Sequence, residues 1–130
     1  MGGTAMVKTI VSIVISFGLI FGLSFYEICY VRKTFYDFHQ ILDSLYQKTE
    51  SHTATHEDGT AVRAYWEEEK HTLHVWLPHT MLQEVDYHLD EAIGYLYNDD
   101  YANALAQLEV ARELSLEIPR CYSIGLQNIF

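Results

Sequence analysis

The sequence predicts an all-α protein in which one N-terminal transmembrane helix continues into a small antiparallel helical bundle. Three observations predict this class. Residues 9–26 contain no charged side chain, and the remaining chain has only two prolines, Pro78 and Pro119. Apolar residues beyond the first segment recur at spacings of three and four, the period of an amphipathic helix. We therefore divide the chain into an N-terminal tail and anchor, residues 1–31, and an acidic bundle domain, residues 32–130.

The first segment has the length and composition of a membrane span. Eighteen helical residues rise about 27 Å, slightly less than a hydrocarbon core of about 30 Å. The apolar run continues past Glu27 to Val31, and Tyr26 and Tyr30 are aromatic residues of the kind favoured at headgroup level. A cleaved signal peptide is the alternative, but apolar residues continue beyond a cleavage site near Ser24, which favours an uncleaved anchor.

The charges that flank this segment leave its orientation open. Lys8 and the N-terminal amine lie on one side, and Arg32 and Lys33 lie on the other. The count of positive residues that decides orientation is therefore nearly balanced.

Gly18 and Gly22 form a small-x-x-x-small pair inside the span. In a bilayer this spacing lets two helix backbones approach closely, so the pair is a candidate contact with an integral-membrane partner or a second copy. Glycine is also common in membrane helices that make no such contact.

Charge is distributed unevenly along the chain. Residues 1–49 have a net charge of +1, whereas residues 50–130 have a net charge of −11. Such a domain is repelled by nucleic-acid phosphates and by anionic lipid headgroups, which excludes nucleic acid as a main partner.

The apolar stripes predict four bundle helices, at residues 32–48, 61–77, 80–98 and 101–118. The first continues the anchor without a break and ends in a polar loop, residues 51–60.

Two prolines bear on where these helices end. Pro78 lies where the apolar stripe rotates by about 100°, which favours a break between the second and third helices over one kinked helix. Thr80 and Gln83 then fit a capping box, and Pro119 is expected to end the fourth helix.

The chain ends in the segment CYSIGLQNIF, which is apolar for a terminus and is expected to dock on a partner. Its candidate contact residues are Ile124, Leu126, Asn128, Ile129 and Phe130.

The chain has two cysteines, Cys29 and Cys121. Four helices that run out, back, out and back would return Cys121 to the level of Cys29, so a disulfide between them is one hypothesis, provided that the domain lies outside the cytoplasm. Two free cysteines are the alternative.

Glu68, His71 and His74 are the best metal-ligand candidates, because an E-x-x-H pair on one helix occurs in di-metal bundles. The second E-x-x-H copy that such bundles need is missing, so an exposed polar face is the favoured interpretation and no metal or cofactor is assigned. The sequence also lacks a G-x-S-x-G motif and a glycine-rich phosphate loop, and we expect no enzymatic activity.

Several segments follow the pattern of a known family, namely the surroundings of Trp66, residues 79–89, the Asp99–Tyr101 turn with Ala104 and Leu105, and above all the ending LQNIF. In these segments the chain resembles an uncharacterised domain-of-unknown-function family of short, membrane-anchored proteins from endospore-forming Firmicutes. The chain departs from the family pattern at Gly125 and at residues 119–121. The resemblance implies an anchored helical domain on the outer face of the cytoplasmic membrane, and it implies no enzyme.

We therefore expect a single-pass protein of the cell membrane that acts as a non-enzymatic accessory subunit of a membrane complex, in sporulation or the cell envelope. Two alternatives remain open. One is a metal- or ligand-binding sensor domain, and the other is a self-associating structural protein.

Overall fold

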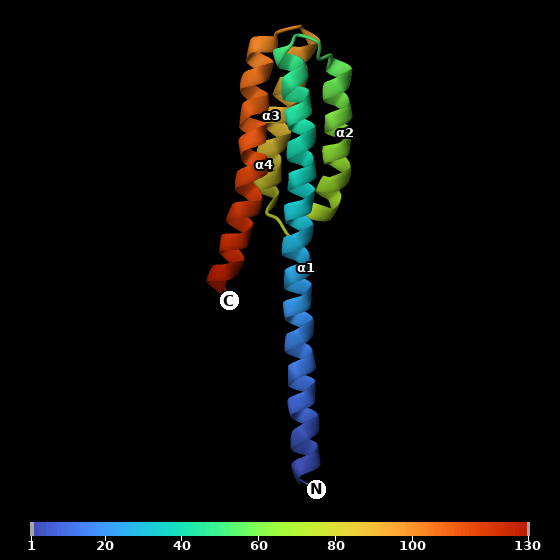
Figure 1. The fold of residues 1–130 in the computed structure, drawn as a ribbon, viewed down its shortest axis with the longest axis vertical. Coiled ribbons are helices and arrows are strands. Elements are labelled where there is room, and N and C mark those ends of the chain that lie inside the picture. Colours follow the sequence, from blue (N-terminus) through green and yellow to red (C-terminus); the bar gives the residue numbers. More distant parts are fainter. Residues whose placement is uncertain (1, 130) are drawn as a thin grey trace.

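The computed structural model describes the backbone of residues 2–129 and the side chains of residues 2–122. This part of the chain contains no strand and forms four helices, α1 (Gly2–Glu50), α2 (His56–Leu73), α3 (His79–Tyr97) and α4 (Tyr101–Ile129). The helices run alternately in opposite directions (Figure 1). Each packs against its two neighbours in a ring, and α4 makes the most extensive contacts, with α1 and with α3. The predicted all-α antiparallel bundle is confirmed.

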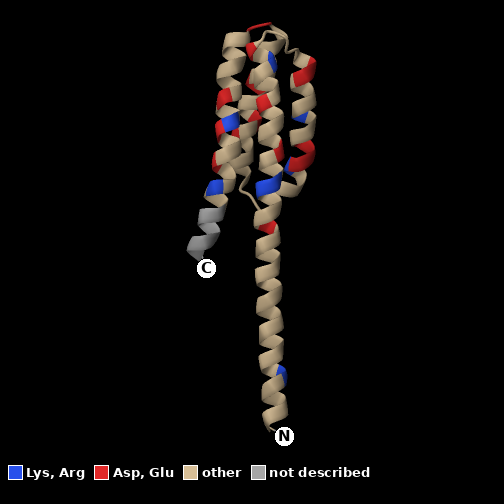
Figure 2. Cartoon of the chain, in the orientation of Figure 1, with Lys and Arg blue, Asp and Glu red and all other residues tan. Residues whose placement is uncertain are grey.

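Helix α1 is a single helix of 49 residues that belongs to the bundle only in its second half. Its buried side chains begin at Val31, and residues 2–23 are all exposed. The first half therefore projects beyond the other helices, and Lys8 and Glu27 are its only charged residues up to Tyr30 (Figure 2). As predicted, the first bundle helix continues the apolar N-terminal segment without a break.

The connection between α1 and α2 is shorter than the predicted loop. Thr55 caps α2: its hydroxyl accepts a hydrogen bond from the Asp58 amide at 3.3 Å, and the Asp58 carboxylate accepts one from the Thr55 amide at 3.0 Å. This capping box starts α2 at His56, five residues before the predicted start at Ala61, because it satisfies two otherwise unpaired backbone amides.

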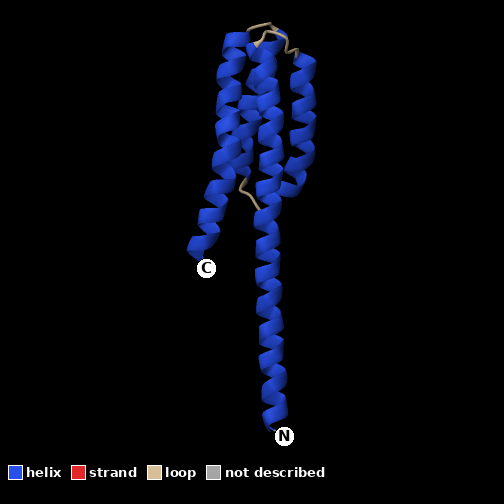
Figure 3. Cartoon of the chain, viewed as in Figure 1, coloured by secondary structure: helices blue, strands red, loops and turns tan. Residues whose placement is uncertain are grey.

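The chain breaks at Pro78, as predicted, in the connection that lies opposite the other two (Figure 3). Helix α2 ends at Leu73, whose carbonyl accepts hydrogen bonds from the amides of Trp76 and Leu77 at 3.0 and 2.9 Å. Pro78 itself is the N-cap of α3, so the predicted capping box at Thr80 is wrong. Proline lacks the N–H that would continue α2 by bonding the carbonyl of His74, so it separates the two helices.

Pro119 lies inside α4, and the prediction that it ends this helix is wrong. Proline removes one backbone hydrogen bond, the one to the carbonyl of Ser115. The residues before it, Ser115 and Ile118, are both buried in the bundle. We attribute the continuity of α4 to this packing, which offsets the lost hydrogen bond.

Trp66 is the largest fully buried side chain, and aromatic residues of α1 surround it. Its ring stacks on Phe38 with centroids 4.7 Å apart and lies 5.9 Å from Phe35. Aliphatic residues fill the rest of the core, namely Val31, Leu42, Leu45, Ala54, Val62, Leu73, Leu77, Leu82, Val85, Leu89, Ala92, Leu96, Ala104, Leu108, Ala111 and Ile118.

Replacement of either of two bundle glycines by alanine is expected to change the stability of the bundle, but in opposite directions. A Cβ atom on Gly59 would lie 2.9 Å from Ile93 Cγ1, whereas a Cβ atom on Gly94 would meet nothing within 4 Å. We expect Gly59→Ala to destabilise the bundle by about 1 kcal/mol through overpacking. We expect Gly94→Ala to stabilise it by about 0.5–1 kcal/mol, because alanine is the better helix former.

Thermal unfolding of the full-length variants in mild detergent, followed by circular dichroism, measures both effects. Stabilisation by Gly59→Ala would contradict the close contact between α2 and α3 at this position.

Candidate functional site

The candidate helix-packing residues Gly18 and Gly22 lie on the projecting half of α1. A Cβ atom added to either glycine would meet no heavy atom within 4 Å beyond the neighbouring backbone of its own helix, and both residues are exposed. Gly22 precedes the core residue Val31 by nine residues, which is about 180° around a helix. The glycine face thus points away from the side of α1 that packs in the bundle, and the domain does not cover it.

The candidate residues of the C-terminal tail, Ile124, Leu126, Asn128, Ile129 and Phe130, lie outside the residues whose side chains are described. The backbone of α4 extends to Ile129. The expectation that these side chains contact a partner therefore stays a prediction.

Cys29 and Cys121 are both exposed and are free cysteines in the structure. The chain does return to the same level, because Tyr122 donates a hydrogen bond to Glu27 at 3.3 Å. Cys29 follows Glu27 by two residues, so it points about 200° away from the side of α1 that faces α4. This orientation separates the two thiols although their backbones lie at similar heights, and the hypothesis of a disulfide gains no support from it.

Glu68, His71 and His74, the candidate metal ligands, are exposed on and just after α2. His74 stacks on His79 across the connection to α3, with ring centroids 5.3 Å apart. Within the described residues, no group of three or more His, Cys, Asp or Glu side chains is arranged to hold a metal ion.

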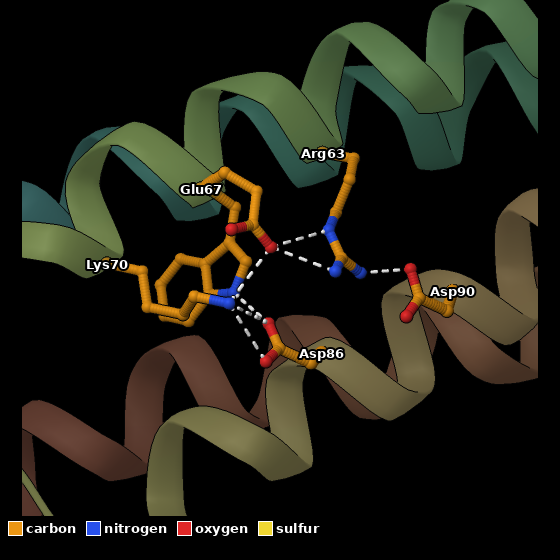
Figure 4. Close-up of polar contacts among 6 residues, drawn as sticks. Arg63, Glu67, Lys70, Asp86 and Asp90 are labelled. Carbon is orange, nitrogen blue, oxygen red and sulfur yellow. Dashed lines mark hydrogen bonds and ion pairs between the residues drawn. The ribbon is translucent and has the colours of Figure 1, made fainter. Parts of the chain in front are cut away.

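The main polar cluster of the bundle joins α2 to α3 (Figure 4). Lys70 donates to both carboxylate oxygens of Asp86 at 3.1 and 3.2 Å and to Glu67 at 2.9 Å. Asp86 also accepts a hydrogen bond from the indole N–H of the buried Trp66 at 2.7 Å. Arg63 extends the cluster by pairing with Glu67 and Asp90.

This cluster was not predicted, because the charged residues of α2 were interpreted as an exposed face. Lys70 and Asp86 are in fact mostly covered, with side chains 15% and 18% exposed. A signal was present in the spacing. Arg63, Glu67 and Lys70 fall on one helix face at intervals of four and three, and Asp86 and Asp90 match them at an interval of four on the next helix.

The ionisation of the cluster follows from its pairing. Burial alone would lower the pKa of Lys70, but its hydrogen bonds to Glu67 and Asp86 outweigh burial and raise it above the ordinary value. The hydrogen bond from Lys70 lowers the pKa of Glu67. Each of these charged groups thus lies next to a group of opposite charge, an arrangement typical of a structural link and not of a proton-transfer site.

A cleft of about 250 Å³ lies between α1 and α4 at the end of the bundle next to the projecting half of α1. Its lining is mainly apolar, with the hydrogen-bonded pair His39 and Ser115 (2.8 Å) at one wall. The complete lining is Arg32, Phe35, Tyr36, His39, Ser115, Leu116 and Pro119.

The comparisons with known proteins give one result. No curated protein and no solved structure matches the chain. The model of a family described as a domain of unknown function (DUF4363) matches residues 25–129, which is nearly the whole chain beyond the apolar half of α1. The chain therefore belongs to this family, whose function is not known.

Proposed function

We propose that the protein is a membrane-anchored, non-enzymatic interaction subunit that positions its bundle next to a membrane protein partner. The observation that carries the proposal is the projecting half of α1. It is the helix in the described chain that is long and apolar enough to cross a membrane, and its apolar window has no buried residue. Its large apolar residues, such as Phe17, Phe21 and Phe25, are more than half exposed. In water this surface would be unfavourable, whereas in lipid or against another helix it is covered.

Two features support an interaction role over a catalytic one. The buried charges of α2 and α3 are engaged with each other, as the contacts of Lys70 and Asp86 illustrate. The glycine face of α1 is open and points away from the bundle core, so a partner helix can approach without meeting the domain.

The cellular setting rests on the resemblance described above and not on the geometry. A role in sporulation or the cell envelope, with the bundle outside the cytoplasm, fits a family of short anchored proteins from endospore-forming bacteria. A cysteine-accessibility assay on intact cells with a membrane-impermeant reagent shows on which side of the membrane the bundle lies, because Cys121 is exposed.

Replacing Gly18 and Gly22 together by leucine is expected to abolish co-purification of the partner. Leucine side chains keep two backbones from the close approach that glycine allows, and they leave the apolar character of the helix unchanged. The measurement is mass spectrometry of the full-length protein purified from its native membrane in mild detergent, with partner recovery compared with that of the unchanged protein.

The matched control is Ser16→Leu with Ile20→Leu. Each position precedes one of the glycines by two residues, so the control surface lies about 200° around the same helix. We expect the control to retain the partner. Equal recovery from both double variants would contradict the glycine face as the contact.

The same open face also favours self-association as a second candidate. Native mass spectrometry of the detergent complex separates the two, because a homo-oligomer has a multiple of the mass of one chain. The glycine double variant should then be monomeric.

A further inference from the structure

The end of the bundle next to the projecting half of α1, hereafter the near end, gathers aromatic residues from separate parts of the chain. Tyr30 of α1 packs edge-on against Trp76 of the connection between α2 and α3, with ring centroids 5.2 Å apart. Tyr26 stacks on Tyr30 at 6.3 Å, and Tyr122 of α4 reaches Glu27. Tyrosine and tryptophan concentrate where a protein passes from hydrocarbon to headgroups.

An exposed apolar residue lies beside this aromatic group. Val75 occupies the turn between α2 and α3 and is 73% exposed, more than any other large apolar residue of the bundle whose side chain is described. Its neighbour Trp76 is fixed by a hydrogen bond from its amide to the carbonyl of Leu73 at 3.0 Å. The turn thus presents an apolar side chain on a fixed backbone at the level of Tyr30.

Cations lie at a similar height. Arg32 and Lys33 of α1 are exposed, and the fold brings the exposed Arg120 of α4 close to them in level, since Tyr122 contacts Glu27. Figure 2 shows basic segments of α1 and α4 at one height, where the bundle meets the projecting half of α1. Three of the seven cations beyond Tyr30 are therefore at the near end, although the domain as a whole is acidic.

Acidic side chains at the near end are engaged by neighbours. Glu69 accepts a hydrogen bond from Tyr30 at 3.4 Å, Glu27 accepts one from Tyr122, and Glu117 pairs with Arg120 at 3.2 Å. Lys33 lies at the rim of a polar cleft that Asp37 and Glu69 also line.

Helix geometry places these groups relative to a bilayer. A hydrocarbon core of about 30 Å needs about 20 helical residues, which leads from Thr9 to Ile28. Tyr30 then lies about 3 Å and Lys33 about 7.5 Å beyond the hydrocarbon, and each headgroup layer is about 5–8 Å thick. Tyr30, Arg32 and Lys33 therefore fall in the headgroup layer, and Trp76, which packs against Tyr30, lies at the same level.

We propose that the near end of the bundle is a second membrane contact that docks on anionic phospholipid headgroups, with Val75 and Trp76 entering the interface and Lys33, Arg32 and Arg120 facing the phosphates. The inference rests on the proposed anchoring by α1. It also changes the expectation that the acidic domain is repelled by anionic headgroups, because most of its acidic residues lie farther from the surface than Arg32, Lys33 and Arg120. The acidic residues at the near end itself, Glu27, Glu69 and Glu117, are engaged by Tyr122, Tyr30 and Arg120.

Lipid-borne quenching of Trp76 tests the docking. Full-length protein is placed in vesicles of equal parts phosphatidylglycerol and phosphatidylcholine, with bromine on the acyl chains of one lipid or the other. The signal of Trp76 is the difference between the unchanged protein and Trp76→Phe, since Trp66 is fully buried and serves as the common background. We expect Trp76 to be quenched, and quenched more strongly when phosphatidylglycerol carries the bromine.

Two lysines of α1 provide a matched pair for the charge dependence. Lys33→Gln and Lys48→Gln remove the same charge from exposed positions 15 residues, or about 22 Å, apart. We expect Lys33→Gln to weaken the preference for phosphatidylglycerol by up to about fivefold, and Lys48→Gln to leave it unchanged.

Flotation of the vesicles distinguishes failure of the proposed anchoring from failure of the proposed docking. A chain that does not float with the vesicles contradicts the proposed anchoring and the docking with it. A chain that floats while Trp76 is not quenched, or is quenched equally by both lipids in the unchanged and Lys33→Gln proteins, contradicts the docking on anionic headgroups alone.

Discussion

Replacing Trp66 by alanine is expected to destabilise the bundle by about 3–5 kcal/mol, the largest effect of any single substitution considered. The side chain is fully buried, stacks on Phe38 and supplies the indole N–H that Asp86 accepts. Its removal leaves a cavity at the centre of the bundle and deprives Asp86 of a donor. For a domain of about 100 residues this corresponds to a fall in Tm of more than about 10 °C, read from thermal unfolding of the full-length protein in mild detergent.

Two further variants separate the causes. Trp66→Phe keeps most of the ring packing and removes the N–H, so we expect a smaller loss, about 1–2 kcal/mol. Tyr87→Ala removes an aromatic ring that is 56% exposed on α3 and should change stability by less than about 0.5 kcal/mol. Equal loss in all three variants would contradict the central position of Trp66.

Replacing Asp86 by leucine is expected to cost about 2–3 kcal/mol. The Trp66 N–H would lose its acceptor, and Lys70 would keep only Glu67, on its own helix, in a largely covered site where losing a counter-charge is costly. The expected loss is smaller than for a fully buried pair, because the side chains of Lys70 and Asp86 retain some exposure to water.

Asp86→Asn and a double variant show which contact matters. Asparagine retains an oxygen that can accept from Trp66 but has no charge for Lys70, so Asp86→Asn should lose about half as much stability as Asp86→Leu. Adding Lys70→Met to Asp86→Leu removes the cation that has lost its partner on α3 and should recover part of the loss. If the double variant unfolds at the same temperature as Asp86→Leu, the ion pair is not the main link between α2 and α3.

Local patterns in the sequence were sufficient to predict most of the fold. The uncharged run of residues 9–26 indicated the projecting helix, and the rotation of the apolar stripe at Pro78 indicated the break between α2 and α3. Both signals are contained within about one helix length, where spacing alone determines which side chains share a face.

The errors arose where tertiary packing or competing caps decide the outcome. The local sequence around Pro119 predicts the end of a helix, but α4 continues through it. Ser115 and Ile118, on its N-terminal side, are buried in the core. Thr55 and Thr80 carry similar capping patterns, and only the structure shows that Thr55 is used. The pairing of Lys70 with Asp86 depends on how two helices face each other, which no single stretch of sequence specifies.

The glycine face and the C-terminal tail illustrate what sequence reasoning offers for function. Gly18 and Gly22 were chosen for their spacing, and the structure adds that their face is uncovered. It does not identify a partner, because a contact surface is formed by two molecules and the structure contains only one of them.

On the proposed anchoring, the continuity of α1 would make the helix a rigid lever that pivots at the bilayer surface. From Tyr26 to Glu50 the helix extends about 36 Å, so a tilt of about 10° in the lipid-embedded arm displaces the opposite end by about 6 Å. Helices tilt when the hydrocarbon thickness around them changes. Because the same helix forms the largest helix–helix contact of the bundle, the one with α4, that movement would be transmitted to the whole domain and not absorbed in a hinge. On the proposed anchoring, a change in membrane thickness would thereby shift the end of the bundle at Glu50, about 36 Å along α1 from Tyr26.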